Sequence, residues 1–337
     1  MPTIPLAVIG LGAIGRLCAE IALERDNLAI VGAADLDPEL AGRDLGQVLG
    51  RPDAGIRVGE SLAEALTGAP KGVALLTTTS SLAETAGQIE ACLAAGWRVV
   101  STCEELVYPF WSQPDLAGEI DAAAKEAGLA VLGTGVNPGF AMDALPAFLS
   151  GAMRRVEAVM VERFLDASTR RLPVQKKIGA GLSPAEFQAK AASGVIRHVG
   201  FRESIDLIAA AWGIELTRGE EKVLPVMAVT EMTSPHLSVA PGQVAGMDQI
   251  ARGFLGEKPV ITLHLQAYFG HPDPKERIVL KGEPPLEMVI PGGLPADVAI
   301  CARAVNAVPH LIEASPGLRT VLDMGACACP YYAVSRS

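Results

Sequence analysis

The stretch IPLAVIGLGAIG, residues 4–15, decides the fold. An apolar run leads directly into glycines spaced G-x-G-x-x-G, and apolar residues then recur at helical spacing as far as Ala22. A buried strand, a tight turn and an amphipathic helix in this order are typical of the first unit of a dinucleotide-binding sheet. Because such glycines also occur by chance, a glycine-rich turn that binds nothing stays open as an alternative.

Each residue of the turn has a physical task in this interpretation. Gly10 makes the turn, Gly12 lets a pyrophosphate approach the backbone, and Gly15 lets helix and strand pack closely. Ala13 and Ile14 open the helix whose N–H groups would meet the phosphates. The turn therefore predicts a cofactor site.

Asp35 closes the next apolar strand, residues 28–34, and follows Gly15 by 20 positions. A carboxylate there accepts hydrogen bonds from the adenosine ribose and repels a 2'-phosphate. NAD is therefore slightly favoured as the cofactor, while Arg16 and Arg43 keep NADP open.

The pattern of apolar residues changes near residue 150. Before it, apolar strands alternate with amphipathic helices without hairpin turns, which predicts an α/β fold with a mostly parallel, doubly wound sheet. After it, stretches such as residues 258–269 alternate apolar and polar side chains, which is typical of a sheet with one covered face.

We therefore expect two domains. Residues 1–150 form a dinucleotide-binding Rossmann domain, and residues 151–337 form a substrate and dimerisation α+β domain with an open mixed sheet covered by helices. A capping box at Ser183 begins one of these helices. The last helix, about residues 295–314, and the tail could instead pack back on the first domain.

Composition and charge exclude several classes of partner. A net charge of −10 argues against nucleic acid and anionic membranes, and no apolar run is long enough to span a bilayer. The N-terminal residues lack the pattern of a signal peptide, so we expect a cytoplasmic protein with a small-molecule substrate. The cysteines lack the spacing of a zinc site, and we predict free thiols and no metal. They are Cys18, Cys92, Cys103, Cys301, Cys327 and Cys329.

Ligands of open parallel sheets bind beyond the carboxyl ends of the strands. Three segments follow predicted strands in this way: residues 77–81, 101–105 and 133–140. The predicted cofactor contacts in them are Thr77, Thr78, Thr79, Thr102 and Asn137. The hydroxyls could equally be helix caps, and the asparagine could be ordinary turn chemistry.

Adjacent carboxylates, Glu104 and Glu105, stand in the middle segment. A carboxylate would repel the alkoxide that forms when an alcohol is oxidised, but it stabilises the cationic iminium that forms when an amine is oxidised. Glu104 lies nearer the strand end and is the better candidate for a catalytic group. Both glutamates could instead only compensate the dipole of a helix start, and Glu105 fits that role better.

Five motifs together resemble the 2,4-diaminopentanoate dehydrogenases and related native amine dehydrogenases. They span most of the chain and are VIGLGAIG (8–15), STCEELVYP (101–109), GTGVNPGF (133–140), KKIGAGLSPAEF (176–187) and HVGFRES (198–204). The resemblance implies an NAD(P)-dependent oxidoreductase that deaminates an amine or aminates a ketone or aldehyde with ammonia. It also implies a fold similar to dihydrodipicolinate reductase and a homodimer.

The resemblance also assigns residues. It makes Glu104 catalytic, with Glu105 in reserve, and it makes Asn137 and Pro138 cofactor contacts. The predicted substrate-pocket residues are Phe140, Leu182 and His198. For His198, a partly buried hydrogen-bonding role is an equal alternative.

Two departures limit the substrate assignment. The His-His and K-x-D-A-P-S-G-T pattern of true dihydrodipicolinate reductases is absent, which counts against that activity. The candidate partners for a substrate carboxylate, Arg170, Arg171, Lys176 and Lys177, are more typical of a solvated surface. Rival functions are a reductase of another C=N or C=O substrate on the same fold and a dinucleotide-binding regulatory protein without turnover.

Overall fold

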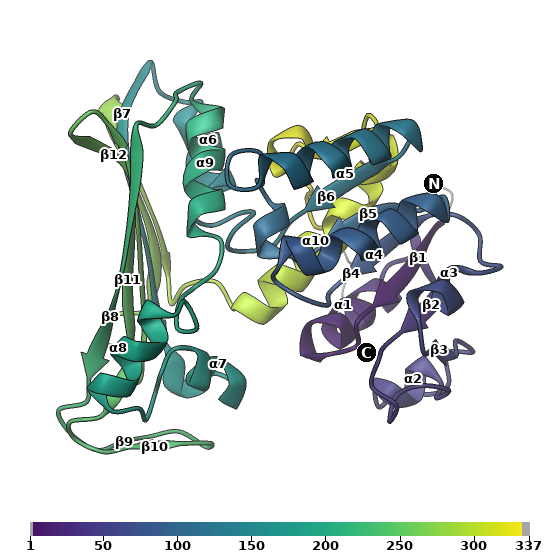
Figure 1. The fold of residues 1–337 in the computed structure, drawn as a ribbon, viewed down its shortest axis with the longest axis horizontal. Helices are drawn as coiled ribbons and strands as arrows, with labels where there is room; N and C mark the ends of the chain where they lie inside the picture. The colour runs from purple at the N-terminus through teal and green to yellow at the C-terminus, as the bar shows by residue number, and fades with distance from the viewer. Residues whose placement is uncertain (1–2, 332–337) are drawn as a thin grey trace. The chain divides into compact units, whose positions relative to one another are not determined.

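The computed structural model describes residues 3–331 and divides them into two compact units. The first unit comprises the described residues up to Phe140 and those from Pro295 onward, and the second comprises Ala141–Leu294 (Figure 1). The chain therefore leaves the first unit once and returns to it. The final helix and the segment after it belong to the first unit.

Within residues 3–331, the first unit holds a seven-stranded, fully parallel sheet in the order β15-β6-β5-β4-β1-β2-β3, named here the parallel sheet. Its strands are β1 Ile4–Ile9, β2 Leu28–Ala34, β3 Val58–Gly59, β4 Val73–Leu76, β5 Arg98–Ser101, β6 Ala130–Gly133 and β15 Gly317–Arg319. The predicted doubly wound parallel sheet is confirmed. The order reverses beside β1, which is the topological switch point where such sheets bind ligands.

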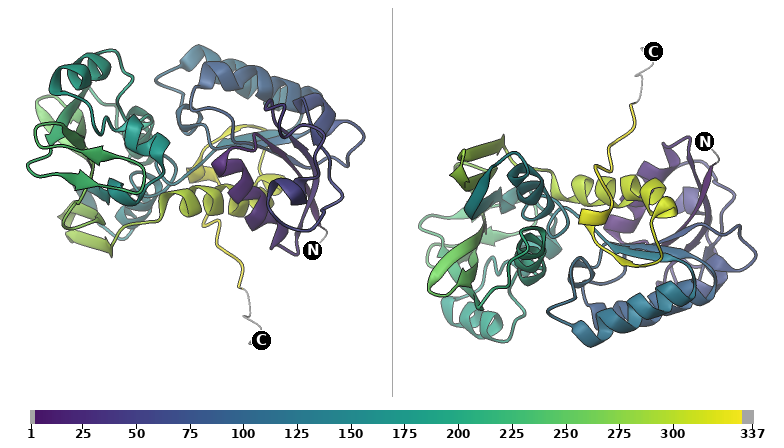
Figure 2. Two further views of the ribbon diagram at one scale, coloured as in Figure 1. Left: turned by 90° about the horizontal axis from the view of Figure 1, so that it is seen from below. Right: turned by 90° about the horizontal axis from the view of Figure 1, so that it is seen from above.

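Helices cover both faces of the parallel sheet. They are α1 Ala13–Leu23, α3 Leu62–Leu66, α4 Leu82–Ala94, α5 Pro114–Glu126 and α10 Ala296–Glu313. A further short helix, α2 Leu45–Val48, lies in the connection between β2 and β3. On one face α10 packs against α1, β5 and β6, and both views of Figure 2 show it running along the sheet. On the other face α4 packs against α3 and α5. Because both faces are covered, β4 and β6 are buried along their whole length and read as continuous apolar runs.

Two strands of the parallel sheet escaped prediction because they are short. Strand β3 has two residues, and β15 has three. Strand β15 pairs with β6, and the backbone N–H of Leu318 donates to the Asp121 carboxylate of α5 at 3.0 Å. The return of the chain to the first unit therefore adds an edge strand to its sheet.

Within the described residues, the second unit holds a six-stranded sheet in the order β14-β13-β7-β12-β11-β8, named here the mixed sheet. Only the β7–β12 pair is parallel. The strands are β7 Arg155–Asp166, β8 Arg218–Met227, β11 Val244–Leu255, β12 Lys258–Tyr268, β13 Lys275–Glu283 and β14 Leu286–Pro291, and a separate hairpin joins β9 Met232–Thr233 and β10 Ser238–Val239. The predicted open sheet is confirmed.

Helices lie on one face of the mixed sheet (Figure 1). They are α6 Ala144–Ser150, α7 Leu172–Lys177, α8 Pro184–Ala192 and α9 Phe201–Ala211. The predicted capping box opens α8, since the Ser183 hydroxyl and the Glu186 side chain each bond the other's backbone N–H. In β12 the alternate residues Ile261, Leu263 and Leu265 are buried, as the alternating sequence predicts.

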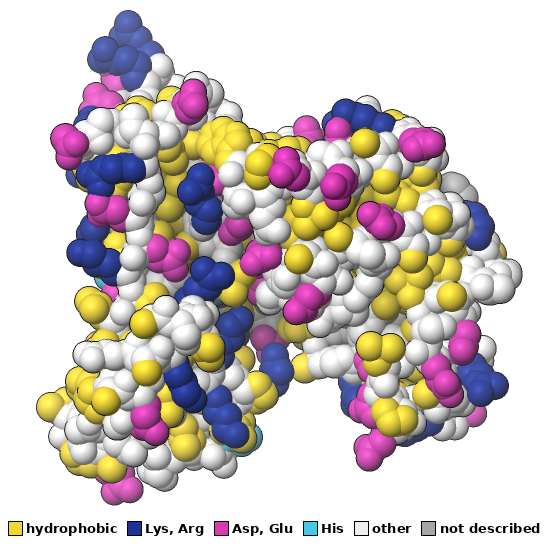
Figure 3. All heavy atoms as spheres, viewed as in Figure 1, with side chains coloured by type: hydrophobic (Ala, Val, Ile, Leu, Met, Phe, Trp, Pro, Cys, Tyr) yellow, Lys and Arg dark blue, Asp and Glu magenta, His cyan; other side chains and the backbone are white. Residues whose placement is uncertain are grey.

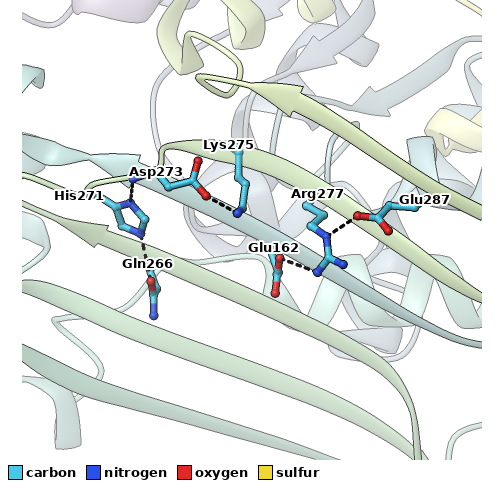
Figure 4. Close-up of polar contacts among 7 residues, drawn as sticks. All are labelled: Glu162, Gln266, His271, Asp273, Lys275, Arg277 and Glu287. Atoms are coloured by element: carbon cyan, nitrogen blue, oxygen red, sulfur yellow. Dashed lines mark hydrogen bonds and ion pairs between the residues drawn. The ribbon is translucent and has the colours of Figure 1, made fainter.

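Polar side chains spread over the open face of the mixed sheet (Figure 4). Arg277 of β13 reaches Glu287 of β14 at 2.7 Å and Glu162 of β7 at 3.2 Å. His271 contacts the Gln266 amide oxygen at 3.1 Å. The Arg277 pairs join neighbouring strands, and the His271 contact joins β12 to the turn that follows it. Within residues 3–331 the helices of this unit lie on the opposite face of this sheet.

The helix-covered face of the mixed sheet holds one deeply buried ion pair. Arg163 of β7 and Glu276 of β13 meet at 2.6 Å, with side chains 4% and 2% exposed. Burial lowers the pKa of Arg163 and raises the pKa of Glu276, while each charge opposes the shift of its partner. The two strands are therefore joined by charge within an otherwise apolar part of the covered face, beside Val161 and Ile278.

The exposed faces of α4 and α5 are acidic. Figure 3 shows acidic side chains over this part of the surface, and the two helices contribute Glu84, Glu90, Asp115, Glu119 and Glu126. Among residues 3–331, no helix is both long and apolar enough to cross a membrane.

Candidate active site

The glycine-rich turn between β1 and α1 is closed by direct backbone contacts. Gly10 has φ +90°, and its N–H donates to the Ala34 carbonyl at 2.9 Å. A Cβ on Gly15 would lie 1.7 Å from the Gly10 carbonyl oxygen, so only glycine lets α1 approach the turn. A Cβ on Gly12 would meet nothing within 4 Å. No side chain caps α1 at Gly12, which leaves its first N–H groups available to an anion.

A cavity of about 450 Å³ opens over this turn. Its lining residues are Ile9, Gly10, Gly12, Ala34, Asp35, Leu36, Glu60, Ser61, Leu62, Thr77, Thr78 and Gln88. The Asp35 carboxylate accepts the N–H of Leu11 through one oxygen and the N–H of Asp37, at 2.8 Å, through the other. Each carboxylate oxygen accepts more than one bond, so Asp35 keeps capacity for ribose hydroxyls. The turn formed by Gly10, Gly12 and Gly15, named here the glycine cradle, fits a dinucleotide together with the uncapped start of α1 and the Asp35 carboxylate.

The ends of four strands lie side by side at this edge of the parallel sheet. Ile9 pairs with Leu76, Leu76 with Ser101, and Ser101 with Gly133. The segments that follow these strands therefore begin at one edge. They contain the predicted cofactor residues Thr77, Thr78, Thr79, Thr102, Asn137 and Pro138.

The hydroxyls after β4 bond within the protein. The Thr77 hydroxyl donates to the Gly10 carbonyl at 2.7 Å and thereby ties β4 to the glycine turn. The hydroxyls of Thr78 and Thr79 donate to side chains of α4, Gln88 at 2.8 Å and Glu84 at 2.6 Å. Thr77 and Thr78 nevertheless line the cavity.

The segment after β6 folds tightly on itself. Gly139 has φ +114°, and a Cβ there would lie 2.5 Å from the Gly135 nitrogen. Asn137 and Pro138 are buried, and the peptide bond between them is cis. Phe140 ends the segment with its ring 4.7 Å from the Arg303 guanidinium of α10.

The two adjacent glutamates follow β5 and begin the short 3-10 turn η1 Glu104–Leu106. Glu105 directs its carboxylate to the N–H of Leu82, the first residue of α4, at 2.9 Å, and to the Gln113 side chain at 3.1 Å. Within residues 3–331, the Glu104 carboxylate has no hydrogen-bond or ion-pair partner, and its side chain is partly exposed. The structure thus separates one engaged carboxylate from one available carboxylate.

Leu182 and His198, two predicted substrate residues, lie in loops of the second unit. The Leu182 carbonyl accepts the N–H of Val244 at the start of β11. The backbone of His198 bonds twice to the buried Gln249 side chain, at 2.7 and 3.1 Å, and its ring contacts Phe201. Phe140 belongs to the first unit.

The basic candidates for a substrate carboxylate cluster around α7. Arg170 and Arg171 precede this helix, and Lys176 and Lys177 end it. The sequence interpretation missed Arg163, which is far more deeply buried, because a charged residue within a strand pattern gives no sign of its partner. It also missed Glu60 and Ser61 in the cofactor cavity, since they follow the two-residue strand β3.

Comparisons with known proteins agree with these features. The profile of the 2,4-diaminopentanoate dehydrogenase C-terminal domain matches residues 140–335. The 2,4-diaminopentanoate dehydrogenase of Acetoanaerobium sticklandii is 30% identical over 96% of this chain and 94% of its own length. An amine dehydrogenase of Streptomyces virginiae is 24% identical over 95% of this chain and 96% of its own length.

Solved structures are similar as well. The amine dehydrogenase from Mycobacterium smegmatis superimposes with a TM-score of 0.86 at 27% identity and covers 97% of both chains. A dihydrodipicolinate reductase from Paenisporosarcina sp. TG-14 reaches a TM-score of 0.52 at 12% identity over 93% of this chain and 96% of its own, which shows a shared fold.

The fold of the parallel sheet, the glycine cradle and the similar proteins together define the chain as an NAD(P)-dependent oxidoreductase. Within that class, the chain belongs to the 2,4-diaminopentanoate dehydrogenase family, whose profile and full-length relative it matches. The resemblance seen in the five sequence motifs is confirmed.

Proposed function

We propose that this enzyme is an amine dehydrogenase. It deaminates a small amine or diamino acid oxidatively and, in reverse, aminates a ketone or aldehyde with ammonia. The observation that carries the proposal is the available Glu104 carboxylate at the end of β5, on the same sheet edge as the glycine cradle. The names of the similar enzymes support it.

Charge explains why Glu104 suits an amine. A bound nicotinamide supplies hydride acceptance or donation at the substrate carbon. The carbon and nitrogen become positively charged in the iminium, and a fixed carboxylate stabilises that charge. The same carboxylate accepts a proton from ammonium or from attacking water and returns it later. Glu104 has no competing cation among the described residues, so its charge stays available for this purpose.

We also propose that NAD is preferred over NADP. The cavity is lined by two carboxylates, Asp35 and Glu60, and by no lysine or arginine among the described residues. A 2'-phosphate beside Asp35 would be repelled without a compensating cation. Arg16 bonds the Leu11 carbonyl through its Nε at 2.7 Å, and neither it nor Arg43 lines the cavity.

The second unit is proposed to bind the substrate and to dimerise. Leu182 and His198 are its proposed substrate residues, with Phe140 from the first unit. The open face of the mixed sheet supports a homodimer, since it presents partly exposed side chains that none of the described helices covers. Light scattering after size exclusion would test this, and a strictly monomeric protein would contradict it.

A substrate panel tests the function. NADH and NADPH absorbance is followed with ketones and aldehydes in the presence and absence of ammonium, and with small amines and 2,4-diaminopentanoate in the oxidative direction. We expect consumption that requires ammonium and is faster with NADH. Consumption without ammonium would favour a C=O reductase, and tight cofactor binding without turnover would favour a regulatory protein.

A further inference from the structure

Glu105 forms hydrogen bonds to two structural elements beside the catalytic edge. This name is used here for the edge of the parallel sheet at which β1, β4, β5 and β6 end. Its Oε2 accepts the Leu82 N–H at 2.9 Å and the Gln113 side-chain N–H at 3.1 Å. Its own N–H lies 3.4 Å from the Ser80 carbonyl. Leu82 opens α4, and Gln113 precedes α5. The one side chain therefore links the turn after β5 to the starts of two helices.

The bond to Leu82 is favoured by charge. The side chain of the N-cap residue Ser81 does not cap α4, so the first N–H groups of this helix need another acceptor. A carboxylate at a helix N-terminus makes a charge-assisted bond and also compensates the helix dipole. Glu105 thus supplies the missing cap from a distant part of the chain.

The turn η1 is held from a second side by backbone packing. Leu106 is fully buried, and a Cβ added to Gly133 of β6 would lie 2.5 Å from the Leu106 carbonyl carbon. Packing against β6 fixes the last residue of the turn, and the bonds of the Glu105 side chain fix its middle residue. Glu104 stands immediately before Glu105, and no other residue in the described range 3–331 bonds its carboxylate to orient it.

We propose that Glu105 is a positioning residue, which anchors η1 to α4 and to Gln113 so that the neighbouring Glu104 carboxylate is held at the catalytic edge. This inference rests on the proposed function, because it presumes that Glu104 acts on the substrate. The two glutamates then have different roles. The hydrogen-bonded carboxylate of Glu105 orients the turn, and the carboxylate of Glu104, unbonded within the described residues, acts on the substrate.

The test compares two substitutions of Glu105 in the full-length enzyme, measured by ammonium-dependent NADH oxidation. Glu105→Ala removes both bonds, and kcat should fall by about 10- to 100-fold, as expected when a reacting group is misplaced by about 1 Å. Glu105→Gln keeps an oxygen that accepts the same bonds, so kcat should stay within about threefold. NADH affinity should remain within about twofold in both variants. Glu90→Ala, which removes an exposed carboxylate from α4, is the matched control and should leave kcat unchanged.

The outcomes separate the possibilities. A Glu105→Gln variant as inactive as Glu105→Ala would mean that the negative charge, and not the two hydrogen bonds, is what the reaction needs, and unchanged kcat in Glu105→Ala would mean that the anchor is dispensable; either result overturns the inference. If Glu105→Ala does not fold, Gln113→Ala removes one of the two bonds, and kcat should fall by about fivefold to tenfold with NADH affinity retained; a kcat within about twofold of the wild type would overturn the inference. A wild-type enzyme without ammonium-dependent turnover would instead overturn the proposed function.

Discussion

The parallel sheet and the mixed sheet differ in where their polar side chains lie. The parallel sheet is apolar on both faces and gathers its polar groups at one edge, where β1, β4, β5 and β6 end. The mixed sheet covers one face with helices and spreads charged side chains over the other (Figure 4). Since the parallel strands all end in the same direction, their edge concentrates functional groups from segments far apart in sequence. An open face instead distributes its polar groups along each strand.

The largest effect is expected from breaking the buried ion pair of the mixed sheet. Arg163→Met would leave Glu276 as a buried charge without its partner, and unfolding free energy should fall by about 3–5 kcal/mol. Urea denaturation measures the change. The double substitution Arg163→Met with Glu276→Leu should recover most of the loss, because no isolated charge remains. A single variant as stable as the wild type would show that the covered face tolerates charge.

The glycine cradle tests the edge of the parallel sheet. Gly15→Ala places a Cβ 1.7 Å from the Gly10 carbonyl oxygen, and the enforced shift of α1 should cost about 1–3 kcal/mol of stability and disrupt NADH binding. Gly12→Ala is the control, since its Cβ meets no protein atom within 4 Å. It should keep the wild-type Tm and weaken only NADH binding. Equal losses of Tm in the two variants would contradict the geometry.

The open face should respond weakly. Arg277→Ala removes ion pairs to Glu162 and Glu287, and partly exposed pairs of this kind contribute about 0–1 kcal/mol. The Tm, measured by calorimetry at low protein concentration, should therefore change little. A loss comparable to that of Arg163→Met would show that the open face is as critical as the covered one.

The smallest effect is expected from thiol labelling of the native protein. Only the exposed thiol should react, and its labelling should not change the stability of the fold. Burial raises the pKa of Cys103 to about 11 and that of Cys92 to about 12, so their reactive thiolates are scarce at neutral pH. Among the six cysteines only Cys329 is exposed. A chromogenic disulfide should react rapidly with one thiol per native chain and with all six after denaturation. Fast labelling of several thiols in the native protein would contradict the burial.

Sequence patterns predicted the elements whose burial leaves a regular signal. The strands at residues 28–34 and 4–9 match β2 and β1 because continuous apolar runs mark doubly covered strands. The alternation of apolar and polar residues predicted β12, because only one face of that strand is covered. Strand β15 was not predicted, since three residues are too few to show a period and its pairing with β6 joins distant segments.

The site was predictable in its parts but not in its internal bonds. The G-x-G-x-x-G spacing and Asp35 reflect backbone geometry that sequence encodes locally. Adjacent glutamates look equivalent in sequence. Their difference arises from the N–H of Leu82 and the side chain of Gln113, which reach Glu105 from other elements. Such long-range hydrogen bonds leave no periodic signal.

The central claim is that the Glu104 carboxylate carries the chemistry. The direct measurement is ammonium-dependent NADH oxidation by Glu104→Gln, which keeps the shape of the side chain and removes its charge. We expect kcat to fall by about 1,000-fold or more while NADH affinity stays within about twofold, because the charge acts only in the transition state. Retention of wild-type kcat by Glu104→Gln would contradict the account.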